Sequence, residues 1–419
     1  MLKRWSFFKN SGISFRTLSV LFTLKFIIGI SVYYVYTYYY TDRKTADVFK
    51  YFDDAKYLYD HVYHNNQVRF WKIIFGIQNE SSEIHKHLKE TNYWFKPHAS
   101  NVFNDNRTVI RFNAVIYLFS FGYYHVHTLV LSTLSFIGLT GIYRTYIYQF
   151  RQSKKELILA CFLIPSVLFW GSGILKESIL LFGIGIFVFA FTRILYSENK
   201  IKYILLVFGT LGLLAITKTY VLITLIPSVL AWTVVHYFKL KKKGWTFFIV
   251  NIGLIIIAFN AKYINQNIDL SGNLKYKQRD FINVARDTKA GSTIKLGELD
   301  DTAWSYLKNT PQAFINGMFR PTLIEMKNIF FALTAFENTM FLILIVLAIF
   351  FFKKPTVNQL PYLYFGLYFS LLLTILIGLT VPVLGAIVRY KIPFMPFTMS
   401  ILLLSIDYSK IKNLLDHNS

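Results

Sequence analysis

The sequence predicts an all-α polytopic membrane protein with about ten transmembrane helices and two large extracytoplasmic loops. The chain has 419 residues, of which 54% are hydrophobic. These apolar residues come in blocks of about 20, which is the length that a helix needs to cross a bilayer. Backbone polar groups inside lipid must be satisfied within their own segment, so we expect the spans to be helices.

We expect ten spans, which follow in chain order: 17–40, 126–147, 157–174, 178–197, 201–217, 221–238, 245–262, 326–352, 360–380 and 391–407. If the N-terminus is cytoplasmic, every cytoplasmic link is basic, as the positive-inside rule requires. The expected organisation is therefore a cytoplasmic N-terminus at 1–16, a single transmembrane domain at 17–407 and a cytoplasmic tail at 408–419.

The formal net charge is +23. In a soluble protein this charge would suggest a nucleic-acid partner, but here the basic residues follow the topology, so we expect membrane lipids and no nucleic acid as partners. The frequent use of Phe, Tyr, Ile, Lys and Asn suits an AT-rich bacterial genome. We therefore expect an integral protein of the bacterial inner (plasma) membrane with both termini in the cytoplasm.

Two long polar segments, 41–125 and 263–325, form the expected outer loops and contain most of the acidic residues. Long loops in compact proteins usually carry function. The stretch 107–126 is apolar but contains Arg107 and Arg111, and the second span follows it directly. We expect this stretch to form a helix at the outer membrane surface.

Each short outer turn contains a basic residue close to membrane depth. With the end of the second outer loop, these turns supply the following candidate donor-binding residues: Lys176, Glu177, Lys218, Arg320, Arg389, Tyr390 and Lys391. Ionisable groups at this depth are costly unless they are paired or used. Lysine and arginine can neutralise the phosphate of a lipid-linked substrate. The alternative is that these cations only extend to lipid head groups and set the depth of the helices.

Candidate catalytic carboxylates follow the first span. Asp47, Tyr51 and Asp54 recur at helical spacing and share one helix face, with Asp53 beside them. A carboxylate there could remove a proton from an acceptor hydroxyl or amine. The alternative is a surface helix with solvated acids. A divalent cation is left open as a cofactor, because neither the acid spacing nor the His-x-His pairs at 85–87 and 125–127 are diagnostic.

These motifs together resemble the glycosyltransferase-C superfamily, whose polytopic enzymes take sugars from polyprenyl-phosphate donors. The resemblance places Asp47 at the family's catalytic aspartate and Tyr51 at the aromatic residue that follows it. The stretch IPSVLFWGSGILKES resembles a turn where the family often carries an acid, which Glu177 matches. VRYKIPFMPF is similar to the family's Arg-Tyr-x-x-Pro stretch, so Arg389 and Tyr390 would match donor-phosphate contacts.

The expected function is therefore that of an enzyme, an integral-membrane glycosyltransferase working at the extracytoplasmic face. Its partners would be a lipid-linked sugar donor and a glycan, lipid or protein acceptor. One alternative is an oligosaccharide repeat-unit polymerase or ligase that uses polyprenyl-diphosphate-linked glycans. A second alternative is a non-enzymatic membrane scaffold of the cell envelope. The spans contain few polar residues at mid-bilayer, which counts against a transporter.

Overall fold

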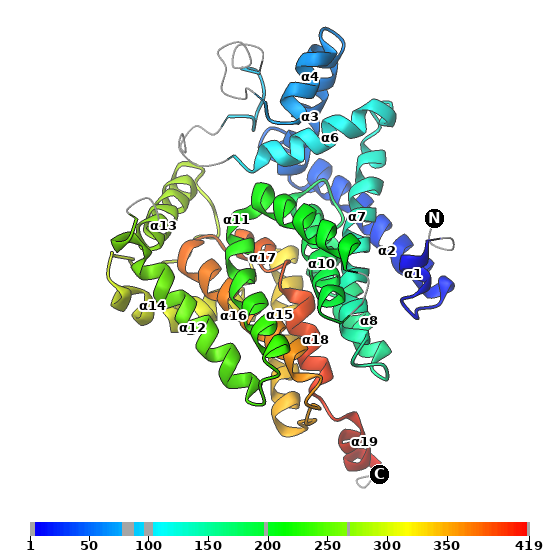
Figure 1. Ribbon diagram of the computed structural model, residues 1–419. Helices are drawn as coiled ribbons and strands as arrows, with labels where there is room; N and C mark the ends of the chain where they lie inside the picture. The colour runs from blue at the N-terminus through cyan, green and yellow to red at the C-terminus, as the bar shows by residue number, and fades with distance from the viewer. Residues whose placement is uncertain (1–4, 78–87, 96–103, 197–199, 266–268, 417–419) are drawn as a thin grey trace. The chain divides into compact units, whose positions relative to one another are not determined.

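The computed structural model describes residues 5–77, 88–95, 104–196, 200–265 and 269–416 (Figure 1). Within these ranges all regular secondary structure is helical, apart from two isolated backbone bridges, Thr293 with Val383 and Phe352 with Ile406. The predicted all-α class is therefore confirmed.

Seven helices in the described ranges are long and apolar enough to cross a membrane, in agreement with a helical membrane protein. They are Phe15–Tyr39, Tyr124–Ile147, Lys176–Tyr196, Ile201–Tyr237, Lys243–Tyr263, Ile329–Phe350 and Leu360–Thr380. A further pair, α17 (Leu384–Tyr390) and α18 (Met395–Leu404), is bent by 68° and becomes an eighth span if the two helices are taken as one.

The count of ten spans is not confirmed: with the bent pair taken as one span the described ranges contain eight, and two regions account for the difference between eight and ten. The expected span 157–174 is divided into α8 (Lys154–Phe162) and α9 (Pro165–Trp170), because Pro165 has no backbone N–H to continue the helix. The expected spans 201–217 and 221–238 are the two arms of α11 (Ile201–Tyr237), which is counted as one long apolar helix although it breaks between them. This helix is interrupted at Lys218, which has the extended backbone angles φ −154° and ψ 90°.

The chain divides into two compact units. The first consists of Met1–Gly141, Val167–Ala190 and Ile204–Thr219, and the second of Ile142–Ser166, Phe191–Tyr203 and Tyr220–Ser419. Four helices contribute residues to both units: α7 (Tyr124–Ile147), α9, α10 (Lys176–Tyr196) and α11. Each unit is described separately below.

The first expected outer loop folds into helices whose buried side chains form one core with residues outside the loop, among them Val32, Leu131 and Ile179. In Figure 1, α3 (Asp47–Tyr57), α4 (Gln67–Ile74) and α6 (Asn106–Ser120) lie side by side, coloured blue to cyan. The chain reaches them through α1 (Ser6–Lys9), α2 (Phe15–Tyr34) and a π-helical turn, Val35–Tyr39. A second π-helical turn, Leu58–Tyr63, links α3 to α4. The buried side chains of this core are aliphatic and aromatic, the aromatic ones including Phe49, Phe52, Phe70, Trp94 and Tyr117.

The helix expected over 107–126 is present as α6, and it ends where Phe121 and Gly122 take the positive φ angles 52° and 78°. The two arginines of α6 bind the segments that precede it. Nε of Arg107 donates to the carbonyl of Trp94 at 2.9 Å, and Nε of Arg111 donates to the carbonyl of Ile73 at 2.8 Å. Burial and the neighbouring Arg107 lower the pKa of Arg111 to about 10. These arginines therefore tie α6 to the earlier part of the first expected outer loop.

In the first unit, α7 and α10 touch through their backbones at two glycines. A Cβ added to Gly185 would lie 1.9 Å from the carbonyl oxygen of Gly138, and a Cβ on Gly138 would lie 2.1 Å from that of Leu181. Small residues that allow such close approach are typical of helix pairs in membranes. This contact holds α7 and the first half of α10, which begins with Lys176, together within the first unit.

The second unit is organised around α16 (Leu360–Thr380). Its other helices are α8, α12 (Lys243–Asn260), α13 (Leu270–Asp287), α14 (Ala303–Phe319), α15 (Ile329–Phe350), α17, α18 and α19 (Tyr408–Asp416), with short 3₁₀ turns at Ala261–Tyr263 and Leu323–Glu325. α14 packs tightly on α16, since a Cβ on Gly378 would lie 1.8 Å from the carbonyl oxygen of Ala313.

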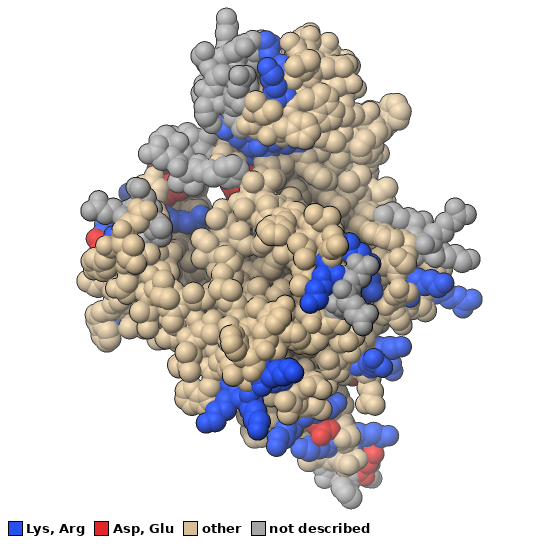
Figure 2. All heavy atoms as spheres, in the orientation of Figure 1, with Lys and Arg blue, Asp and Glu red and all other residues tan. Residues whose placement is uncertain are grey.

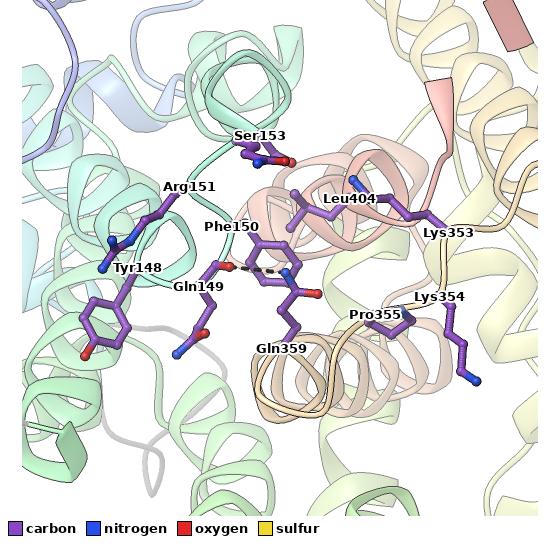
Figure 3. Close-up of a pocket in the computed structure, with 11 residues that line it drawn as sticks. Tyr148, Gln149, Phe150, Arg151, Ser153, Lys353, Lys354, Pro355, Gln359 and Leu404 are labelled. Atoms are coloured by element: carbon purple, nitrogen blue, oxygen red, sulfur yellow. Dashed lines mark hydrogen bonds between the residues drawn. The ribbon is translucent and has the colours of Figure 1, made fainter. Parts of the chain in front are cut away.

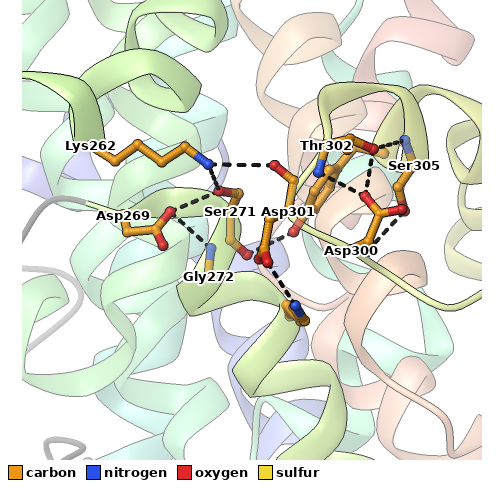
Figure 4. Close-up of polar contacts among 10 residues, drawn as sticks. Lys262, Asp269, Ser271, Gly272, Asp300, Asp301, Thr302 and Ser305 are labelled. Atoms are coloured by element: carbon orange, nitrogen blue, oxygen red, sulfur yellow. Dashed lines mark hydrogen bonds and ion pairs between the residues drawn. The ribbon is translucent and has the colours of Figure 1, made fainter. Parts of the chain in front are cut away.

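The second expected outer loop is likewise folded, as α13, α14 and a polar network that joins them (Figure 4). Asp269 caps α13, because its carboxylate accepts a hydrogen bond from the backbone N–H of Gly272 at 2.9 Å. This bond lowers the pKa of Asp269. Lys275 pairs with Asp301 at 2.9 Å, and Tyr306 donates to the carbonyl of Ser271 at 2.7 Å. The acids of this loop therefore fix its fold.

Candidate functional site

Asp47 is the first residue of α3, where a negative charge is favoured by the helix dipole. Its carboxylate is partly exposed. The phenolic hydroxyl of Tyr93, which lies 46 residues further along the chain, donates to Oδ1 of Asp47 at 2.5 Å. Asp47 is therefore an oriented carboxylate with access to solvent, as a general base needs to be.

Tyr51, one helical turn after Asp47, lies between Tyr93 and Lys176, so the two tyrosines link this carboxylate to the lysine. The ring centroid of Tyr51 lies 5.5 Å from that of Tyr93 and 6.0 Å from Nζ of Lys176. The Tyr51 hydroxyl donates to Oδ1 of Asn106 at 3.0 Å. We call the set Asp47, Tyr51, Tyr93, Asp105, Asn106 and Lys176 the Asp47–Lys176 cluster.

Lys176 is buried, with 8% of its surface exposed, and its ammonium forms a 2.6 Å ion pair with Asp105. A buried charge needs such a partner, because burying an unpaired charge costs on the order of several kcal/mol. Asp105 immediately precedes α6, and Lys176 begins α10. The ion pair therefore holds the first turn of α10 against the segment that supplies Asn106.

The other two candidate catalytic acids have different surroundings. Asp53 accepts two hydrogen bonds from the guanidinium of Arg43, at 2.9 and 2.5 Å, on the surface. Asp54 is buried and accepts from the backbone N–H groups of Asn92 and Tyr93, each at 2.7 Å. Burial raises the pKa of Asp54, and these hydrogen bonds partly oppose that rise. Asp54 therefore positions Tyr93.

The first unit also contains Glu177 and Lys218, which are both buried. Glu177 is the second residue of α10, and Lys218 is the interruption in α11. Thr108 of α6 binds the backbone next to this interruption. Its hydroxyl donates to the carbonyl of Ile216 at 2.6 Å. The expected contact of Glu177 and Lys218 with a lipid-linked donor stays a prediction.

The second unit contains Arg320, Arg389, Tyr390 and Lys391. Nζ of Lys391 donates to the carbonyls of Met318 and Arg320, both at 2.8 Å, and to Oδ1 of Asn338 at 3.2 Å. An ammonium has three N–H groups, so these three acceptors match its capacity. In this arrangement Lys391 fixes the chain between α14 and α15, and a phosphate would have to displace one of the acceptors.

Arg320 and Tyr390 lie in two further settings of the second unit. The guanidinium of Arg320 pairs with Glu325 and donates to Oδ1 of Asn316 at 3.1 Å. This pairing lowers the pKa of Glu325. Tyr390 lines a small cavity with Tyr220 and Lys277, and the two tyrosine ring centroids lie 6.0 Å apart. Arg389 lies in the last turn of α17, beside Tyr390.

The candidate residues therefore fall into two sets. The first unit brings Asp47 and Lys176 into one cluster, with Asp54 behind it, while Asp53 lies apart in its surface ion pair. In the second unit Lys391 binds the backbone of Arg320. Sequence reasoning missed Tyr93, Asp105, Asn106 and Lys277. Tyr93, Asp105 and Asn106 lie in a polar, aromatic part of the first expected outer loop. No helical spacing in the sequence connects them to Asp47.

Metal binding stays open. Within the described ranges no three or more His, Cys, Asp or Glu side chains gather as the ligands of a metal ion would. The His-x-His pair at 85–87 lies outside the described residues.

Comparisons of the chain with protein-family models, with curated proteins and with solved structures find no match. The candidate site therefore rests on its own geometry.

Proposed function

We propose that this chain is an integral-membrane glycosyltransferase that moves a sugar from a polyprenyl-phosphate donor to an acceptor at the extracytoplasmic face. The observation that carries the proposal is the Asp47–Lys176 cluster. It combines a partly exposed carboxylate, which can accept a proton, with an ammonium linked to it through the rings of Tyr93 and Tyr51. A folded outer segment of α3, α4 and α6 supports this cluster.

In the proposed reaction Asp47 removes the proton from a hydroxyl of the acceptor. The hydroxyl oxygen attacks the anomeric carbon of the donor sugar, and the bond between that carbon and the phosphate oxygen breaks. Polyprenyl phosphate leaves with the bonding electron pair. Its new negative charge is compensated by a cation, for which we assign Lys176, because fixed charges stabilise developing charge most effectively where water is partly excluded.

Asp47→Asn tests the assignment of the base. Purified protein in nanodiscs would be given a panel of polyprenyl-phosphate-linked hexoses and pentoses with a membrane extract as the acceptor. Release of polyprenyl phosphate would be followed by mass spectrometry. We expect the rate to fall by about 10²- to 10⁴-fold, the usual contribution of a general base. Asp60→Asn is the matched control, since Asp60 is exposed in the same outer segment.

Three results would contradict parts of the proposal. Full activity in Asp47→Asn would remove Asp47 as the base. Products of steadily increasing length would favour the repeat-unit polymerase. Absence of release with every donor of the panel would favour a membrane scaffold.

A further inference from the structure

A basic cavity lies in the second unit, at the end of α16 that begins with Leu360. Its volume is about 400 Å³, and eleven residues line it (Figure 3). Three of these residues are basic, namely Arg151, Lys353 and Lys354, and none of the eleven is acidic. In the part of the chain that the structure describes, none of the three basic side chains forms an ion pair.

Two connections build the walls of this cavity. One joins α7 to α8 and contains Arg151, and the other joins α15 to α16 and contains Lys353. Nε2 of Gln359 donates to the backbone carbonyl of Gln149 at 3.2 Å and so links the two connections. The second connection is also fixed to the end of α18, because the backbone N–H of Lys353 donates to the carbonyl of Ser405 at 2.9 Å. The cavity is therefore supported on two sides by hydrogen bonds.

The side chains are not equivalent. Figure 3 shows Lys353 pointing toward Leu404, while Arg151 lies beside Tyr148 and Lys354 points away from the other two. Cations that served only to anchor helices would extend outward to lipid head groups. Lys353 instead turns toward a hollow that also contains hydroxyl and amide groups, which are hydrogen-bonding partners suited to phosphate oxygens.

The length of α16 indicates where the cavity lies in a membrane. α16 has 21 residues, which corresponds to about 30 Å, the thickness of the hydrocarbon core. The basic cavity lies at its first residues, and the small Tyr390 cavity is lined by Leu376 and Thr380 near its end. A membrane-spanning α16 would place the two cavities at opposite surfaces, each at the level of lipid head groups.

More basic residues lie around the same end of α16. A second groove there is lined by Lys241, Lys242 and Lys243 together with Trp245 and Tyr364. Figure 2 shows Lys and Arg gathered near the beginning of α12, where these lysines lie. Basic pockets between membrane helices are typical binding places for anionic lipid head groups.

We propose that Arg151 and Lys353 form a binding site for a phosphate group, supplied by the head group of an anionic phospholipid. The acyl chains of that lipid would lie along the apolar helices that end at the cavity. A soluble phosphate compound would use the same two cations, so the experiment separates the two sources. This site is independent of the Asp47–Lys176 cluster and of the sugar transfer assigned to it.

The full chain would be placed in phosphatidylcholine nanodiscs with a small fraction of phosphatidylglycerol, and lipid retention would be measured by native mass spectrometry. The test variant is Arg151→Gln with Lys353→Gln. We expect phosphatidylglycerol to bind about 30-fold more weakly to it than to the wild type, at about 1 kcal/mol for each basic residue. The control is Lys154→Gln with Lys155→Gln, which removes the same charge from exposed residues outside the cavity.

Inorganic diphosphate is the second probe. Preferential retention of phosphatidylglycerol by the wild type and by the control supports a lipid site. Preferential binding of diphosphate alone supports a phosphate site with a soluble ligand. Equal binding of both probes by the wild type and the test variant would overturn the proposal. If the double Gln variant does not fold, the single variants Arg151→Gln and Lys353→Gln are measured in its place, and unchanged retention of phosphatidylglycerol in both would overturn the proposal.

Discussion

The phenolic hydroxyl of Tyr93 donates a 2.5 Å hydrogen bond to Asp47, and the backbone N–H of the same tyrosine donates to Asp54 at 2.7 Å. The two aspartates are seven residues apart, two turns along one face of α3. One helix face therefore holds Tyr93 at two points. The buried carboxylate fixes the backbone of Tyr93, and the partly exposed carboxylate receives its side chain.

Tyr93→Phe should lower the rate of sugar transfer by about tenfold, because it removes one hydrogen bond to a charged carboxylate and leaves the ring in place. The measurement is the release of polyprenyl phosphate by the purified variant. Tyr123→Phe is the matched control, since Tyr123 is 70% exposed. Equal rates in the two variants would show that Tyr93 does not orient the base.

Asp54 should make stability depend on pH. Burial raises its pKa above the ordinary value of 3.8. The native protein therefore binds a proton more tightly than the unfolded chain does, and the stabilisation that results is complete below about pH 4. It is lost as the pH rises through the folded-state pKa. We expect this decline in the wild type and not in Asp54→Asn.

Thermal unfolding in detergent between pH 4 and pH 7 would measure this difference. Asp60→Asn should keep the decline of the wild type, since Asp60 is exposed. Parallel curves for the wild type and Asp54→Asn would contradict the assignment.

Lys176 and Asp105 can be separated into a structural and a functional contribution. Lys176→Gln leaves Asp105 without its 2.6 Å partner and should reduce the free energy of unfolding by about 1–3 kcal/mol. Adding Asp105→Asn should recover most of that loss, because the uncompensated charge disappears. If Lys176 contacts the donor phosphate, the double variant is stable and still shows a raised KM for the donor. Recovery of both stability and KM would reduce Lys176 to a structural role.

Gly185→Ala should weaken the packing of α7 on α10, since its Cβ would lie 1.9 Å from the carbonyl oxygen of Gly138. The backbones must separate, and we expect a loss of about 1–3 kcal/mol in the free energy of unfolding. Gly212→Ala is the control within α11, because nothing lies within 4 Å of its added Cβ. It should be neutral or slightly stabilising. A similar melting temperature for the two variants would contradict the close contact.

The helical class and most of the long apolar helices could be predicted, because burying backbone polar groups in lipid leaves few alternatives. The expected segment 157–174 differed from the structure, although Pro165 was visible in it, since hydropathy alone does not register a missing N–H. The helical register of Asp47, Tyr51 and Asp54 was also predictable. Their different surroundings were not, because Tyr93 and Arg43 reach them from outside that register.

The amino-acid sequence by itself determined that this chain is a helical membrane protein with acids after its first span and basic residues at its turns, because both follow from local hydropathy and spacing. Only the tertiary structure decided which acid is partly exposed and which is buried, and that Lys176 pairs with Asp105 while Lys391 binds Asn338 and two carbonyls. The physical reason is that burial and pairing depend on residues far apart in the chain, and no periodic pattern encodes their contacts.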